Sequence, residues 1–137
     1  MAFVRGFLTA LIGSLVANLA LLFLIRPFVI DSATPLNALS IGPVSVFTIL
    51  GVVGATIVYA LLRRFLTNPN MIFVWIAVVV LIISFVPDYM VIGQTTGMFA
   101  GGNVASALLL MLMHVVTAAI VVWSMTNLWG KRSITAS

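Results

Sequence analysis

Four long runs of this chain contain no aspartate, glutamate, lysine or arginine. They extend from Gly6 to Ile25, Pro43 to Leu62, Met71 to Val86 and Val104 to Leu128. A chain of 137 residues cannot bury that much apolar surface in a soluble core, because small domains leave a large share of their surface exposed. A bilayer needs about 20 apolar residues for each helical crossing. The runs predict an all-α polytopic membrane protein with four transmembrane helices, at about residues 6–26, 43–63, 69–87 and 104–128.

The composition supports a membrane protein. Hydrophobic residues make up 64% of the chain and charged residues 6%, against roughly 25% charged in ordinary domains. The runs do not alternate with a period of two, which excludes a transmembrane β-barrel. The first run is too long for a signal peptide and lacks a cleavage site, so we expect a retained helix. The connections are too short to form a core, so residues 1–137 are predicted to be a single transmembrane domain.

The helix ends are marked by proline, asparagine and glycine. Pro43 suits the first turn of the second helix, and Asn68-Pro69 is typical of the start of the third. Pro87 is expected to end the third helix, and Gly101-Gly102-Asn103 to precede the fourth. The connection between Asp88 and Asn103 is nearly uncharged and partly apolar. It is expected either to lie at the membrane interface or against a partner, or to fold back over its own bundle.

The basic residues predict an orientation. Five of them lie on the side of the N-terminus: Arg5, Arg63, Arg64, Lys131 and Arg132. Only Arg26 lies opposite, together with Asp31 and Asp88, either of which is a possible partner for it. Because basic residues favour the cytoplasmic side, both termini are expected in the cytoplasm, in a multi-pass protein of the bacterial inner membrane. Trp75 and Trp129 are expected to anchor that side at the interface.

Small residues recur on the first two helices. Such residues let neighbouring helix backbones approach closely in lipid, where apolar burial supplies no drive for association. We interpret them as packing positions rather than functional ones. They are Gly6, Ala10, Gly13, Ala17 and Ala20 on the first helix, and Gly51 and Ala55 on the second.

His114 is the only histidine and lies within the fourth run. At about 1.5 Å per residue it is roughly 15 Å from the outer end of its helix, and Asn18 is about 12 Å from the outer end of the first. A hydrogen bond between these side chains is therefore a hypothesis. With Ser84 and Thr48 they suggest a shallow polar pocket that opens outward, although hydrogen bonding at helix ends also accounts for such residues.

The role of His114 stays open among a structural residue, a proton or ligand site, and a cofactor ligand. The chain has one histidine and no cysteine, so neither a two-histidine haem site nor a three-ligand metal site can be formed within one chain. Ligation by His114 together with Met111, or with a methionine of a neighbouring helix, stays conceivable but is not specific. No cofactor and no metal are predicted.

Three segments resemble a known family. They are VANLALLFLI, RRFLTNPNMIFVWIAVVVLIISFVPDY and ALLLMLMHVVTAAIV. The chain is similar over nearly its whole length to small bacterial four-helix membrane proteins, the domain of unknown function family 6069. The resemblance implies the four-helix fold and draws attention to His114, but it implies no activity. Residues 65–68 before Pro69 and the acid at Asp88 depart from the family's pattern. The most specific elements are Arg63-Arg64 with Pro69 and Phe73, Ser84 with Pro87, and Met113-His114.

Two function classes follow. The first is a non-catalytic accessory or structural subunit that packs within a larger membrane complex, favoured by the small-residue stripe and the uncharged outer connections. The second is a small oligomeric transporter, channel or ligand-binding protein that uses the Asn18 and His114 region. An enzyme is not expected, because no catalytic constellation is present. The expected partners are the lipid bilayer and other membrane subunits or a second copy. Nucleic acid is not expected, because the basic residues are scattered.

Overall fold

The computed structural model describes residues 1–29 and 36–129. Over these residues the chain is helical, and four helices are long and apolar enough to cross a membrane. This confirms the predicted fold class. Asp31, Lys131 and Arg132 lie outside the described residues. The helices are α1 (Ala2–Val29), η1 (Asn37–Leu39), α2 (Ile41–Phe65), α3 (Pro69–Met90), η2 (Gly97–Phe99), α4 (Val104–Trp123) and η3 (Ser124–Trp129), of which η1 and η2 are short 3₁₀-helices and η3 is a π-helix.

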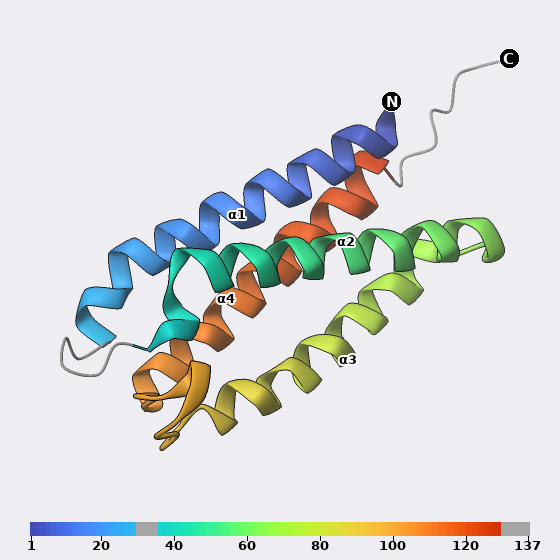
Figure 1. The fold of residues 1–137 in the computed structure, drawn as a ribbon. Coiled ribbons are helices and arrows are strands. Elements are labelled where there is room, and N and C mark those ends of the chain that lie inside the picture. The colour runs from blue at the N-terminus through green and yellow to red at the C-terminus, as the bar shows by residue number, and fades with distance from the viewer. Residues whose placement is uncertain (30–35, 130–137) are drawn as a thin grey trace, which may run out of the picture.

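The long helices are not equally packed (Figure 1). α1 lies against α2, α4 and η3, and α3 packs mainly against α4. α2 and α3 meet at their connecting turn and diverge toward the other end of the molecule. The N-terminus, the α2–α3 turn and η3 lie at one end, here called the inner end, and η1 and η2 lie at the other, the outer end. These names follow the predicted orientation and are used only as labels.

The interior face of α1 follows a strict four-residue spacing. Its buried residues are Gly6, Ala10, Ser14, Asn18 and Leu22. Gly6 and Ala10 of the predicted stripe lie on this buried face, and a Cβ atom at Gly13 would lie 3.2 Å from Ile120 Cγ2 of α4, so Gly13 is also at a close helix contact. Ala17 is half-buried, and the prediction is wrong at Ala20, which is exposed. A constant spacing of four follows one i±4 ridge of a helix, which is the ridge used in many helix contacts.

Gly51 was predicted as a packing position, but no described helix of this chain packs against it. A Cβ atom built at Gly51 would meet nothing within 4 Å, and the same is true at Gly54. Ala55, one turn along α2 from Gly51, is half-buried. The glycines of α2 therefore leave open space rather than bringing two helices together.

Trp129 of η3 contacts residues of α1 and α2 at the inner end. Its ring contacts Phe3 and Tyr59 edge-on, at centroid separations of 4.7 and 5.1 Å. Arg63 donates a hydrogen bond to the Trp129 carbonyl, and its guanidinium lies 5.4 Å from the Trp129 ring centroid. Trp129 is thus half-buried between helices, whereas Trp75 is exposed as an interfacial anchor would be.

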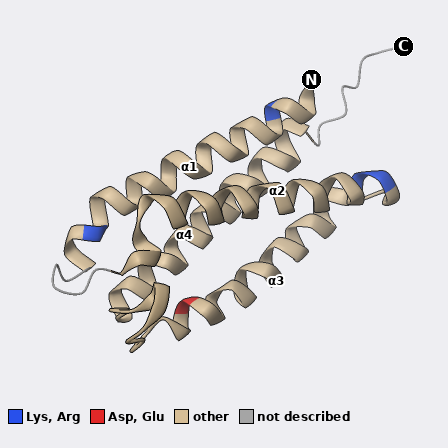
Figure 2. Cartoon of the chain, in the orientation of Figure 1, with Lys and Arg blue, Asp and Glu red and all other residues tan. Residues whose placement is uncertain are grey.

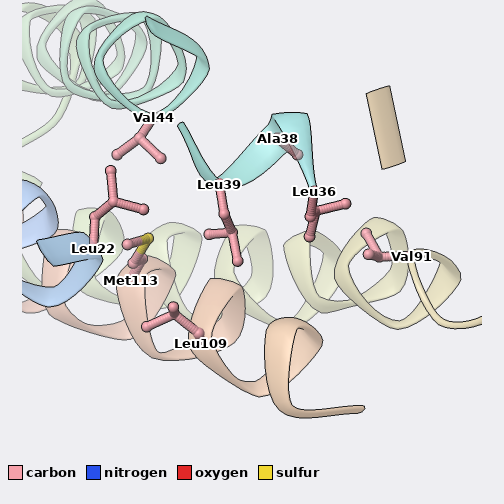
Figure 3. Packing of buried hydrophobic residues seen from close by; sticks show 8 residues of the cluster. All are labelled: Leu22, Leu36, Ala38, Leu39, Val44, Val91, Leu109 and Met113. Carbon is pink, nitrogen blue, oxygen red and sulfur yellow. The ribbon is translucent and has the colours of Figure 1, made fainter. Parts of the chain in front are cut away.

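An apolar cluster closes the outer end (Figure 3). It joins α1, η1, α2 and α4 with the residue that follows α3. Leu36 and Leu39 of the η1 region are fully buried in it, and Val91 is 1% exposed. Its members are Leu22, Leu36, Ala38, Leu39, Val44, Val91, Leu109 and Met113.

The connection from α3 to α4 folds back over the bundle. Gly93 N–H donates to the Gly102 carbonyl and Gly101 N–H donates to the Gln94 carbonyl, each at 3.0 Å. The Asn103 side chain donates to the Val29 carbonyl at the end of α1. Of the two interpretations of this connection, the folded-back one agrees with these contacts.

Three of the predicted helix ends agree with the structure, and one does not. Pro43 lies in the first turn of α2, and Pro69 is the first residue of α3. Asn103 caps α4 by accepting from Ser106 N–H, while Ser106 Oγ accepts from Asn103 N–H. Pro87 does not end α3, which continues to Met90. Membrane helices tolerate an internal proline because neighbouring groups satisfy the carbonyl that it leaves free.

Candidate functional site

A cavity of about 550 Å³ lies where α2 and α3 diverge. One face of α2 and one face of α3 form its walls, and α4 lines it between them. Phe99 of η2 and Ala38 of η1 border it toward the outer end. Most lining side chains are apolar, and the volume lies within the range of pockets for small organic ligands.

The width of the cavity depends on the small residues of α2. Gly51, Gly54 and Ala55 all line it, and the two glycines have open space where a side chain would begin. Opposite them α3 presents larger residues such as Ile76 and Val80. Two absent side chains on one wall therefore keep the space open.

Asp88 and His114 lie within ion-pair distance on the cavity wall, and they form an ion pair only when His114 is protonated. Asp88 lies in the last turn of α3 and is 5% exposed. His114 Nδ1 lies 2.9 Å from Asp88 Oδ2 and also 2.9 Å from the Leu110 carbonyl oxygen. When Nδ1 carries a proton, both of these oxygens are within reach of it, and no other described residue donates to Asp88 Oδ2.

Asn18 joins three helices. Its Nδ2 donates to Thr48 Oγ1 of α2 and to Thr117 Oγ1 of α4, each at 2.9 Å. The hypothesis of a direct Asn18–His114 hydrogen bond is wrong, because Thr117, one turn farther along α4, occupies that position. Asn18 is 4% exposed, and its Oδ1 has no partner among the described residues.

All four predicted polar residues line the same cavity. They are His114, Asn18, Ser84 and Thr48. Ser84 Oγ donates to the Leu81 carbonyl of its own helix, as serines in membrane helices often do. The site therefore contains two buried acceptor oxygens: Asn18 Oδ1 has no hydrogen-bond donor among the described residues, and Asp88 Oδ2 has only His114 Nδ1 within reach.

The charges are divided between the two ends of the bundle (Figure 2). Arg5, Arg63 and Arg64 lie at the inner end, and Arg26 and Asp88 lie at the outer end. In the described part of the chain, no lysine or arginine lines the cavity. Among the described residues no three His, Cys, Asp or Glu side chains form a group that could hold a metal ion.

Two residues that line the cavity, Asp88 and Thr117, were not predicted as site residues. Asp88 was assigned to an outer connection because Pro87 was expected to end the helix. A usable signal was the sequence Tyr-Met-Val-Ile at 89–92, which continues the apolar run after Asp88. Thr117 was not considered, although its spacing of three from His114 places both on one side of α4.

Comparison with known proteins identifies a family but no characterised relative. The model of a family of unknown function, DUF6069, matches residues 2–129. No curated protein and no solved structure matches the chain.

Proposed function

The chain belongs to the family of unknown function DUF6069, and we propose that it binds an amphiphilic small molecule drawn from the bilayer into the cavity between α2, α3 and α4. The observation that carries this proposal is an open apolar cavity with two buried polar side chains, Asn18 and Asp88, in its lining. An apolar pocket with a few convergent polar groups is the usual form of a small-molecule site. Buried acceptors without donors are costly in a protein interior, and a ligand that donates to them removes that cost.

The position of the cavity supports an amphiphile. Its walls are transmembrane helices, so an apolar ligand body replaces lipid chains against them. Asp88 is in the last turn of α3, near the outer end, where a polar head group stays close to the membrane surface. The proposed activity is binding, without a chemical step.

Filling the cavity should remove the ligand. The Gly51→Phe variant places a ring in the open space beside α3, where a Cβ atom meets nothing within 4 Å. The matched control is Gly42→Phe on the same helix, which also has free space but does not line the cavity. We expect native mass spectrometry of protein extracted in mild detergent to show a bound small molecule in the wild type and in Gly42→Phe, but not in Gly51→Phe.

Equal ligand content in all three proteins, or none in the wild type, would contradict the binding proposal. The same preparation tests the accessory-subunit alternative. One observation favours that alternative: α3 buries only Phe73 and Asp88 in this chain and leaves a broad apolar surface. A second polypeptide recovered at constant stoichiometry would support it.

We also propose an orientation: the protein lies in the bacterial inner membrane with both termini on the cytoplasmic side. It rests on Arg5, Arg63 and Arg64 at the inner end. The chain has no cysteine. A single introduced cysteine is therefore the only thiol, and its labelling shows on which side of the membrane that residue lies. In intact bacterial cells a membrane-impermeant maleimide should label Thr96→Cys in the outer connection and leave Thr67→Cys in the α2–α3 turn unlabelled until the cells are opened. The reverse pattern would place both termini outside.

A further inference from the structure

We infer that the cavity selects a lipophilic cation, which it holds through the carboxylate of Asp88. This inference rests on the proposed function and adds the chemical class of the ligand. Asp88 is the only acidic residue among those described. It lines the cavity and is buried among helices that lie in the membrane.

The negative charge of Asp88 faces no lysine or arginine in the described part of the cavity lining. Its only ion-pair partner within the described ranges is His114, whose Nδ1 also lies within hydrogen-bond distance of the Leu110 carbonyl oxygen. His114 supplies a counter-charge only when it is protonated. A buried carboxylate without a counter-charge is unfavourable, and a bound cation supplies that charge.

The other polar groups and the aromatic residues fit the same ligand class. Asn18 Oδ1 is a second acceptor, and its burial with no donor within the described residues favours a ligand that donates hydrogen bonds or carries positive charge. Phe47, Phe73 and Phe99 line the cavity. The faces of aromatic rings attract cations, and they contribute apolar contact to the rest of the ligand. An anionic head group would meet only repulsion at Asp88.

Two probes of the same shape and opposite charge test the inference. Tetraphenylphosphonium and tetraphenylborate are measured by equilibrium dialysis against the full chain in lipid nanodiscs, with empty nanodiscs correcting for partition into lipid. We expect the wild type to bind the cation about tenfold more tightly than the anion, or better. Asp88→Asn should abolish this preference, because it keeps the shape of the side chain and removes its charge.

Asp88→Glu is the control for misfolding, because it changes the same side chain but keeps its negative charge. It should retain the preference for the cation. Gly51→Phe should lose the cation, and Gly42→Phe should bind it as the wild type does. Wild-type binding of the anion as strongly as the cation, blocked by Gly51→Phe, would overturn the selection of cations and leave the binding site in place. Failure of both probes, together with no ligand that depends on Gly51 in mass spectrometry, would overturn the binding site itself.

Discussion

Replacing Gly102 with alanine should lower the free energy of unfolding by about 2–4 kcal/mol. A Cβ atom at this position would lie 2.1 Å from the Val91 carbonyl oxygen and 2.3 Å from Val91 Cγ1. Backbone atoms cannot rotate away as a side chain does, so the two arms of the outer connection must separate. That separation breaks the Gly93–Gly102 hydrogen bond and withdraws Val91 from the apolar cluster with Leu36.

Gly93→Ala is the matched control for Gly102→Ala. Gly93 has a positive φ of 78° but no neighbour within 4 Å of a built Cβ, so alanine there costs only backbone strain, about 1–2 kcal/mol. Both variants are compared by unfolding in mixed detergent micelles, followed by circular dichroism. If Gly102→Ala unfolds no more easily than Gly93→Ala, the outer connection does not pack as described.

The helices were predictable because the bilayer imposes one simple condition on them. A segment that crosses the hydrocarbon must be apolar and must satisfy its own backbone hydrogen bonds. Runs without charge therefore mark helices, and the described helices extend a few residues beyond those runs. The change from α4 to the π-helix η3 was not predictable, because no proline or glycine between Ser124 and Trp129 marks it.

The end of α3 shows where local rules fail. Proline cannot donate a backbone hydrogen bond and usually disfavours a continuing helix. Here the helix continues for three residues beyond Pro87, which carries Asp88 onto the cavity wall beside His114. Whether a proline ends a helix or lies within it depends on the helices around it, and a single sequence does not contain that information.

The interior face of α1 was predicted only in part, for a related reason. Gly6 and Ala10 were recognised because they are small, but Ser14 and Asn18 continue the same face. Sequence reasoning separated the small residues from the polar ones. In the bundle Asn18 has both roles: it packs in the interior, and it donates hydrogen bonds to Thr48 and Thr117.

The cavity depends on the angle between α2 and α3. The spacing of residue types along the sequence does not indicate that angle. Gly51 and Ala55 have the spacing of a packing pair, and only the divergence of α2 from α3 turns this spacing into open space. The polar residues were nevertheless grouped correctly, because depth along each helix can be counted from its ends. The depth of a residue in the membrane follows from its position along its own helix. The side chain that it contacts depends on how the helices pack in the tertiary structure.

Gly6→Leu should also destabilise the bundle, by about 1–3 kcal/mol. A Cβ atom at Gly6 would lie 3.0 Å from Trp129 Cβ and 3.4 Å from the Ser124 carbonyl oxygen. Both atoms belong to or adjoin the backbone of η3, so α1 must move away from it. Leucine gains about 1 kcal/mol of helix propensity over glycine, which offsets part of this loss but cannot relieve the overlap.

Gly54→Leu makes the same chemical change at a position where a built Cβ atom has no neighbour within 4 Å. This variant therefore gains helix propensity without steric overlap. Unfolding in mixed micelles should therefore rank Gly54→Leu at or above the wild type and Gly6→Leu clearly below it. The loss at Gly6 should also disturb the contacts of Trp129 with Phe3 and Tyr59, which near-ultraviolet circular dichroism detects. Equal stability of the two leucine variants would mean that α1 and η3 are not in close contact in the membrane.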